Sequence, residues 1–522
     1  MSSAFTSAVS IITAASILAT FLFPGASFAL AVDLEFGLDV GVDFDTGSTA
    51  RQCVDNLRAA GLGERLYYPN QTVYETRTSA YWSNSQHMRP WSIIRPESAE
   101  EVSATVKTLA KSSTCKFAVR SGGHIAWEGG SNIEDGITID LGALNGVTFN
   151  NETRIASIEP GSRWTEVYEK LDKYGVVVAG GRDGDVGVGG YTLGGGKSWY
   201  IPRVGWACDQ VVNYQVVLAD GRIVEANKDE HADLFLALKG GSANFGIVTR
   251  FDFQTLDETR LWGGMRVMSK SSTPQQIESL VEFTANIPND IYSSYVVLWN
   301  YQPSLGDIAV TAMLANTKAE EKPAAMKRLL AIPAIMDTTK QTTLAQVAAE
   351  SEQPYGYYNS WNTITIKNDP ETIQKAIDLH EIAVQNVKAK SPSGDFSTMC
   401  LFQPLPTLYS KRSLERGGNV MGLEQITEDA IIFMAGMHVS EAEMKDYGDT
   451  QAKEWLAGVE EFARDKGTFV DWMFLNYANK DQKPIATFGD ENIAAIKAAA
   501  AKYDPTGVFQ KQCPGGYKIS QL

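Results

Sequence analysis

Short hydrophobic runs separated by glycine and polar residues fill the chain up to about residue 256. KFAVR (116–120), GITIDL (136–141) and RIASIEP (154–160) carry β-branched residues bounded by Gly, Asn or Asp, which predicts strands. YQVVLADGRIVEA (214–226) has apolar residues on both sides of Ala-Asp-Gly, a pattern typical of a hairpin. SRWTEVYEKLDKYG (162–175) has the periodicity of an amphipathic helix. These segments indicate an α+β domain with glycine-rich connections.

The pattern changes at about residue 258, where longer strand-like runs alternate with longer helices. YSSYVVLW (292–299), DIAVTAML (307–314), FSTMCLFQP (396–404) and AIIFMAGMHV (430–439) are the strand candidates. TIQKAIDLHEIAVQNVKAK (372–390) has apolar residues near helical spacing. We therefore expect a second domain in which an antiparallel sheet is covered by helices on one face. A last, alanine-rich helix is predicted to end before Asp504-Pro505.

The first 32 residues are apolar and carry no charge, and Ala29-Leu30-Ala31 matches a small-residue cleavage site. This predicts a secretory signal peptide over residues 1–31; the alternative is an N-terminal membrane anchor, since the apolar run is long enough to span a bilayer. In a secretory compartment Cys53–Cys115 is the expected disulfide, and the odd number of cysteines leaves at least one free thiol. Sequons at Asn70 and Asn151 suggest glycosylation.

The charge balance argues against nucleic acid as a partner. The 522 residues carry a formal net charge of −16, which repels phosphate backbones. His87, His231, His380 and His438 lie on separate segments without ligand spacing, so we predict no metal site.

Two glycine clusters carry the candidate chemistry: RSGGH (120–124) and AGGRDGDVGVGGYTLGGG (179–196). Neither matches the P-loop pattern Gly-x-x-x-x-Gly-Lys-Ser/Thr, and the Rossmann pattern Gly-x-Gly-x-x-Gly does not occur. Loops of this composition still form anion-binding nests that suit a pyrophosphate, the alternative being tight turns between strands. A histidine beside Gly-Gly has several possible roles: acid, base, metal ligand or nucleophile.

Five separated motifs then appear in order: RSGGH, GGRDGDVGVGGYTLGGG, GWACDQVVNYQVVLADGRIV, DLFLALKGGSANFGIVTRF and KYDPTGVFQ. Together they resemble the berberine bridge enzyme-like FAD-linked oxidases, fungal type, of the vanillyl-alcohol oxidase/p-cresol methylhydroxylase group. The resemblance runs from about residue 65 to 517. It implies a two-part FAD-binding domain, made of residues 32–86, 87–257 and the returning segment 466–522, around a substrate domain over 258–465.

The resemblance also implies the site residues. His124 corresponds to the family histidine that bonds covalently to the flavin 8α-methyl carbon, and Gly122-Gly123 would let the chain approach the flavin edge. The implied cofactor-binding residues are His124, Arg120, Ser121, Gly122, Gly123, Gly187, Gly189, Gly190, Gly194, Gly246, Ile247, Val248 and Asn476. Arg120 would balance cofactor charge, although a paired arginine is an equal alternative.

One position departs from the family pattern. Many carbohydrate oxidases of the family make a second flavin bond through a cysteine, and Asp183 stands at that position here. We therefore expect FAD with a single covalent bond. Asp183 is either a base or an Asx-turn residue, and the turn is favoured. Cys208, beyond this loop, is expected to be a small buried residue.

Tyr477 matches the family tyrosine that takes the substrate hydroxyl proton, and Gln403 matches a position on the substrate-domain sheet facing the flavin. For both, the alternative is a buried polar residue with a satisfied hydrogen bond. The implied reaction is hydride transfer from a small molecule, here a secondary metabolite, to FAD, with O2 as acceptor giving H2O2. The alternatives are a carbohydrate oxidase that makes lactones, a dehydrogenase that avoids oxygen, and a cofactor-free secreted binding protein. The oligomeric state is left open.

Overall fold

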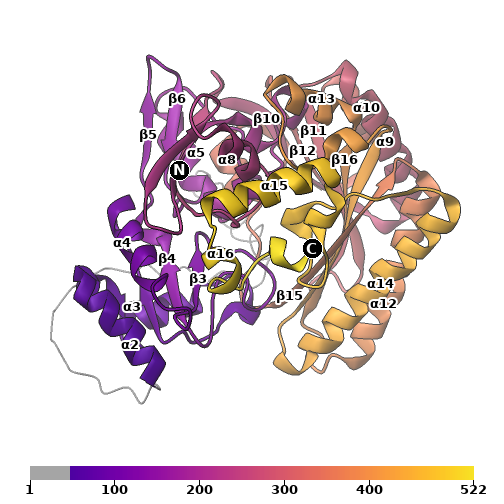
Figure 1. Cartoon of the computed structure of the whole chain (residues 1–522). Coiled ribbons are helices and arrows are strands. Elements are labelled where there is room, and N and C mark those ends of the chain that lie inside the picture. The colour runs from indigo at the N-terminus through magenta and orange to yellow at the C-terminus, as the bar shows by residue number, and fades with distance from the viewer. Residues whose placement is uncertain (1–47) are drawn as a thin grey trace, which may run out of the picture.

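Three sheets organise the chain in a computed structural model that describes residues 48–522 (Figure 1). A four-stranded and a five-stranded sheet belong to the N-terminal half, and a nine-stranded sheet to the C-terminal half. The chain combines these sheets with helices, and the predicted α+β class is confirmed.

The four-stranded sheet is mixed, with one antiparallel and two parallel pairings. Its order is β1 (Leu66–Tyr67), β2 (Ser92–Ile94), β4 (Ile137–Asp140) and β3 (Phe117–Arg120), and β2, β4 and β3 are parallel. Every residue of β4 is buried, as expected for a parallel strand covered on both faces. Helix α4 (Ala99–Leu109) covers this sheet and begins where the Ser98 side chain accepts a hydrogen bond from the Glu101 amide.

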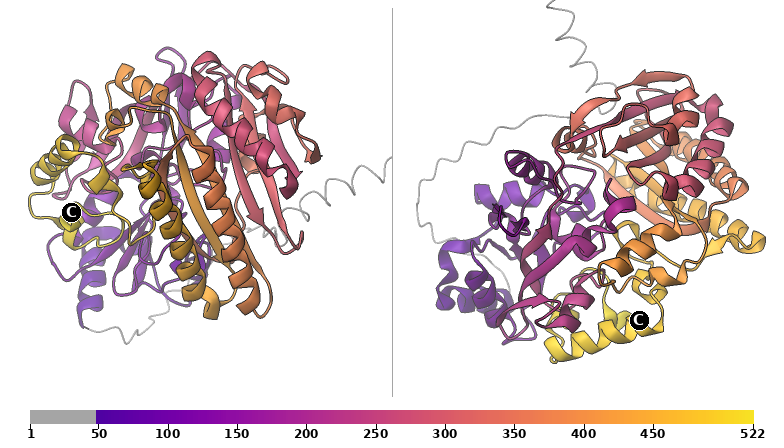
Figure 2. Two further views of the ribbon diagram at one scale, coloured as in Figure 1. Left: turned by 90° about the vertical axis from the view of Figure 1, so that its right-hand side faces the viewer. Right: turned by 90° about the horizontal axis from the view of Figure 1, so that it is seen from above.

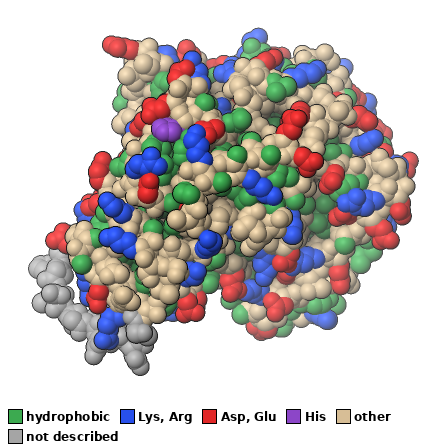
Figure 3. All heavy atoms as spheres, viewed as in Figure 1, with side chains coloured by type: hydrophobic (Ala, Val, Ile, Leu, Met, Phe, Trp, Pro, Cys, Tyr) green, Lys and Arg blue, Asp and Glu red, His purple; other side chains and the backbone are tan. Residues whose placement is uncertain are grey.

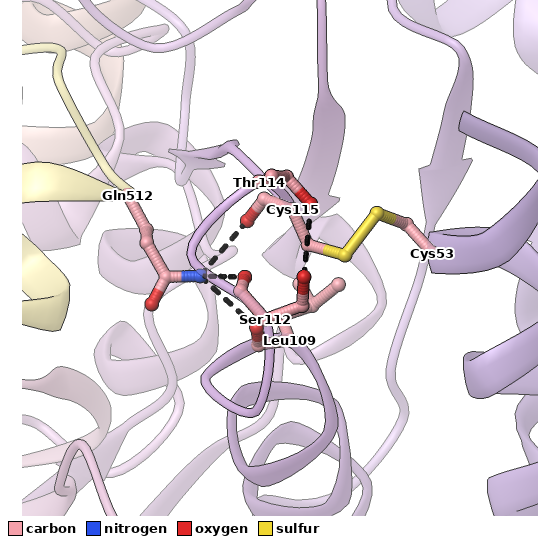
Figure 4. Close-up of a disulfide and its surroundings, with 6 residues drawn as sticks. All are labelled: Cys53, Leu109, Ser112, Thr114, Cys115 and Gln512. Carbon is pink, nitrogen blue, oxygen red and sulfur yellow. Dashed lines mark hydrogen bonds between the residues drawn. A yellow bond between two sulfur atoms is a disulfide. The ribbon is translucent and has the colours of Figure 1, made fainter. Parts of the chain in front are cut away.

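The predicted disulfide is confirmed beside this sheet. Cys53, in α2 (Ser48–Leu57), is bonded to Cys115 across a Cα–Cα distance of 5.7 Å (Figure 4). The Gln512 side-chain amide of the C-terminal segment donates to the carbonyls of Leu109, Ser112 and Cys115 around the same loop. The end of the chain is thus fastened to the N-terminal half.

The five-stranded sheet is antiparallel and contains the predicted hairpin. Its order is β5 (Val147–Asn150), β6 (Ile155–Ile158), β9 (Ile247–Gln254), β7 (Val211–Val217) and β8 (Ile223–Asn227). The β7–β8 turn passes through Gly221 at φ +84°, a conformation that favours glycine. Helix α5 (Trp164–Asp172) confirms the predicted amphipathic segment and buries Trp164 and Leu171.

The nine-stranded sheet is antiparallel and begins directly after β9. Its order is β13 (Ala334–Asp337), β10 (Arg260–Ser269), β12 (Ile308–Asn316), β11 (Ser293–Tyr301), β16 (Phe396–Leu405), β17 (Ala430–Val439), β15 (Tyr358–Lys367) and β18 (Phe469–Val470), with β14 (Lys340–Thr343) also on β10. Helices α9 (Thr273–Asn286), α12 (Pro370–Lys390) and α14 (Lys445–Lys466) lie over one face (Figure 2). The opposite face of the sheet borders a cavity.

The C-terminal segment returns to the N-terminal half after β18. Helix α15 (Asp490–Tyr503) packs on α8 (Ala232–Leu238), where the Tyr503 hydroxyl and the Lys502 ammonium both bind Asp233. Figure 1 shows α15 and α16 (Val508–Lys511) in yellow against this half. Because β18 still belongs to the nine-stranded sheet, the segment leaves that sheet a few residues beyond the boundary expected at 465.

The predicted signal peptide and its cleavage site lie outside the described residues. Within residues 48–522, no helix has both the length and the apolar character needed to cross a membrane. Both sequon asparagines, Asn70 and Asn151, are exposed. On the face drawn in Figure 3, basic and acidic side chains are interspersed rather than gathered into a basic patch.

Candidate functional site

A cavity of about 420 Å³ lies where the two glycine loops, the free face of the nine-stranded sheet and the C-terminal segment meet. Of the residues expected from sequence, all but Arg120 and Gly194 line it. Those that line it are Ser121, Gly122, Gly123, His124, Gly187, Gly189, Gly190, Gly246, Ile247, Val248, Gln403, Asn476 and Tyr477. The topology therefore brings the dispersed motifs to one place.

The glycine loops pack mainly against each other. A Cβ on Gly122 would lie 2.5 Å from the Gly187 amide nitrogen, so neither position admits a side chain. Gly123 adopts φ +72° and would meet the Tyr81 ring at 2.9 Å. Both glycines also line the cavity, and their close approach to a ligand stays a prediction. Gly190 is the glycine of these loops that does face open space, since no atom lies within 4 Å of a Cβ built there.

The His124 ring is fixed in the cavity wall without a partner for one nitrogen. It stacks on Trp82 with centroids 4.2 Å apart and 9° between the planes. Burial, aided by the charge of Arg163, lowers the pKa of His124 to about 3, so the imidazole is neutral. Its Nε2 atom is buried and has no hydrogen-bond partner among the described residues. A neutral, oriented imidazole of this kind is a competent nucleophile.

Asp183 forms the Asx turn expected from the sequence and also faces His124. Its Oδ1 accepts from the Asp185 amide at 2.9 Å and its Oδ2 accepts from the Gln353 amide at 3.1 Å. Burial raises the pKa of Asp183 to about 7, although the two amides favour the charged form. Asp183 Oδ2 lies 3.7 Å from His124 Nε2. Since the histidine is neutral, this contact is not an ion pair.

Arg120 is not among the residues that line the cavity, and its expected role in balancing cofactor charge stays a prediction. Its guanidinium is buried, donates to the carbonyls of Arg77 and Ala80, and lies 3.7 Å from the centre of the Tyr81 ring. The paired-arginine alternative is the one the structure supports.

Gly194 does not line the cavity either, because it packs against Asn476. A Cβ on Gly194 would lie 2.4 Å from the Asn476 Oδ1 atom. The Asn476 amide donates to the Tyr191 carbonyl at 3.1 Å, while its Oδ1 is buried without a partner in the described chain. Gly194 thus makes room for Asn476 and does not line the cavity itself.

Tyr477 and Gln403 are joined by a third residue that sequence reasoning missed. Gln403 Nε2 donates to Tyr477 Oη at 2.7 Å. Arg182 Nη2 lies 2.9 Å from both Tyr477 Oη and Gln403 Oε1 and donates to each. Arg182 directly precedes Asp183 in the glycine loop, and no sequence motif marked it as a site residue. The positively charged guanidinium therefore lies beside the phenol oxygen.

Aromatic and imidazole side chains complete the wall and were also missed. Trp361, on β15, meets Tyr477 edge-on at 5.5 Å and Trp82 at 5.0 Å. His438, on β17, meets Trp82 at 6.2 Å. Cys208 is buried and outside the cavity lining, as expected, and burial raises the pKa of its thiol. Among residues 48–522 no cluster of three His, Cys, Asp or Glu side chains is placed to hold a metal ion.

Comparison with known proteins identifies the family. Residues 90–227 match the model of an FAD binding domain. The FAD-dependent monooxygenase sdcF of Emericella nidulans is 37% identical over 463 residues, covering 88% of this chain and 97% of that protein. The FAD-dependent monooxygenase drtC of Aspergillus calidoustus is 37% identical over 477 residues, covering 90% and 91%. This chain belongs to the berberine bridge enzyme-like FAD-linked oxidoreductases.

Solved structures agree with the family fold. The 6-hydroxy-D-nicotine oxidase of Arthrobacter nicotinovorans superposes with a TM-score of 0.71 at 19% identity, over 88% of this chain and 98% of that one. Xylooligosaccharide oxidase of Myceliophthora thermophila gives 0.71 at 20% identity over 90% and 99%. Berberine bridge enzyme of Eschscholzia californica gives 0.68 at 17% identity over 89% and 99%. At these identities the likeness establishes the fold alone.

The residues of the cavity fit the FAD that this oxidoreductase family binds. His124 and Asn476 line the cavity, and each has a buried polar atom, Nε2 and Oδ1, without a hydrogen-bond partner in the described chain. Gly190 leaves space beside them. Such unsatisfied groups are expensive in a closed protein interior, and a polar ligand would satisfy them.

Proposed function

We propose that this protein is a secreted FAD-dependent oxidase that takes a hydride from a small organic substrate, a secondary metabolite, with FAD bonded to His124 and O2 as the electron acceptor that gives H2O2. The observation that carries the proposal is the Tyr477–Gln403–Arg182 cluster in the same cavity as the unpartnered nitrogen of His124. A proton-accepting group and a cofactor-anchoring group thus face one space.

His124 would hold the cofactor and Asn476 would contact it. The neutral ring would supply a nitrogen lone pair for a single covalent bond, and the Trp82 stack holds the ring in place. The bound flavin would supply the hydride acceptor and the reaction with oxygen. Cys208 lies outside the cavity, and Asp183 stands at the position of the family's second anchoring cysteine, which is the basis for proposing one bond only.

Tyr477 would take the proton from the substrate hydroxyl. Its oxygen accepts hydrogen bonds from Arg182 and Gln403, and both bonds strengthen as negative charge develops on that oxygen. Tyr477 also lines the cavity, where this oxygen would meet a substrate hydroxyl. Arg182 would therefore act as a positioning residue that holds a positive charge beside the oxygen that takes the proton.

A screen of the flavin-loaded protein for H2O2 release tests this proposal. Apolar alcohols and phenols form one arm, and oligosaccharides form the other. Peroxide from the first arm supports the proposal, and peroxide from oligosaccharides alone would make the protein a carbohydrate oxidase. Flavin that is reduced without air and stays reduced when air is admitted would make it a dehydrogenase. A purified protein without flavin would support the cofactor-free binding protein.

A further inference from the structure

His438 is a polar group in the cavity wall that the proposed chemistry does not use. It lies on β17, in register with Ser397 on β16 and Asn359 on β15. The residue is 5% exposed, yet it lines the cavity. Its Nε2 atom is buried and finds no hydrogen-bond partner in the described chain. An orphaned nitrogen of this kind is costly unless a ligand or water satisfies it.

The neighbours of His438 fix which ring nitrogen carries the proton. His438 Nδ1 lies 2.5 Å from Asn359 Oδ1, and the Asn359 amide nitrogen donates to the Tyr357 carbonyl at 3.4 Å, which orients the amide. Because an amide oxygen only accepts, Nδ1 is the donor and Nε2 presents a lone pair. Burial lowers the pKa of His438 to about 4, so the ring stays neutral. Nε2 is therefore an acceptor.

Methionine and leucine side chains form one part of the sheet surface in the cavity. Leu401 on β16 faces both Leu298 and Met434, and Met313 on β12 faces Met265 on β10, farther across the sheet from His438. All five line the cavity. Asn300, Thr311 and Ser397 of the same sheet add polar groups, and no charged side chain of this sheet joins them within the described residues. Methionine side chains adapt to irregular apolar shapes. This surface suits a hydrocarbon framework.

The same surface opposes an oligosaccharide. Each sugar ring carries several hydroxyls, and burying these against methionine and leucine would leave them without partners. A molecule with an apolar body and few, separated polar groups avoids that cost. Its polar groups would find partners at the Tyr477 cluster and at His438 Nε2.

We propose that His438 Nε2 is a substrate-binding acceptor, and that the substrate is a predominantly apolar molecule with a reacting hydroxyl at Tyr477 and a second hydrogen-bond donor at His438. The inference rests on the proposed function, because it takes the Tyr477 cluster as the reacting end. It deepens that function by defining the substrate class and naming a specificity-determining residue.

The test measures ligand binding to the flavin-loaded protein in the absence of oxygen. The change in the flavin absorption spectrum reports the binding. The probes are β-naphthol, a set of dihydroxynaphthalenes that add a second hydroxyl on the other ring, and cellobiose. We expect at least one diol to bind about fivefold more tightly than β-naphthol, the effect of one neutral hydrogen bond. Cellobiose is expected not to compete.

Variants assign the preference to His438. His438→Leu should abolish it, and His438→Gln, which keeps an acceptor, should retain part of it. His380→Leu is the matched control: His380 is a fully buried imidazole on α12 that does not line the cavity, so the preference should persist. Equal binding of all naphthols by wild type, an unchanged preference in His438→Leu, or tighter binding of cellobiose than of any naphthol would each overturn the inference.

These outcomes separate the inference from the proposed function. If a diol preference depends on His438 but no substrate yields H2O2, the oxidase proposal fails and the binding site stands. If peroxide forms from a substrate while the naphthol preference is absent from wild type, this inference fails and the oxidase proposal stands.

Discussion

Replacing Tyr477 by phenylalanine removes a single oxygen atom from the site. The ring would keep its edge-on contacts with Trp361, at 5.5 Å, and Phe474, at 4.9 Å. Arg182 would keep its hydrogen bond to Gln403, so the charge would not be left without a partner. We therefore expect a loss of stability of only about 1–3 kcal/mol from the two lost hydrogen bonds. Flavin content should be unchanged.

The expected loss of rate is much larger. Removing a general base slows the step that it serves by about 10²–10⁴-fold, or about 3–5 kcal/mol of activation free energy. Because the proton leaves the substrate while the flavin is reduced, the reductive half-reaction should slow by that factor. Reoxidation by O2 should change little, since the hydroxyl acts only in the reductive half.

Stopped-flow absorbance separates the two halves. Flavin reduction is followed after anaerobic mixing with substrate, and reoxidation after mixing reduced protein with oxygenated buffer. Tyr409→Phe is the matched control, because Tyr409 is a buried tyrosine outside the cavity lining. Reduction that slows less than about threefold in Tyr477→Phe, or slows equally in Tyr409→Phe, would refute the assignment. Asp183 would then be the next base to test.

Three further predictions follow from single contacts. Gly190→Leu fills open cavity space and should lower bound flavin in the absorption spectrum without lowering the melting temperature, whereas Gly122→Ala should destabilise the fold. Asp183 holds its proton to about pH 7 when folded, so stability should fall as pH rises from about 4 to 7, by at most about 4 kcal/mol, and denaturant titrations of Asp183→Asn should lack this slope. Cys53→Ser, which opens a loop of 62 residues, should cost about 4 kcal/mol by the same titration.

The segments predicted as helices and strands form those elements because their hydrophobic periodicity matches their burial. Other elements were missed, including α9, α14, β9 and β10, and a further one is β15. Its residues YNSWNTITIK mix amides and hydroxyls with apolar positions, which resembles a loop. In the sheet these groups find partners; for example, the Thr363 hydroxyl donates to the Phe433 carbonyl. Such pairings join residues far apart in sequence, so local pattern does not reveal them.

The candidate site was predictable where a motif marked it. His124, Tyr477 and Gln403 were found by resemblance, and all three line one cavity. Arg182 was missed because its value depends on a hydrogen bond to a residue 295 positions away. His438 was set aside because it lacks ligand spacing, yet strand register turns it into the cavity. The roles of Arg182 and His438 depend on tertiary contacts and strand register, which the local sequence does not reveal.

The most direct test of the central claim is the mass of the peptide that contains His124, measured after digestion of the purified protein. The account predicts that this peptide carries one FAD, that no cysteine-containing peptide does, and that His124→Ala yields the unmodified mass. A yellow protein whose His124 peptide has its unmodified mass, with all flavin released by acid, would contradict the account.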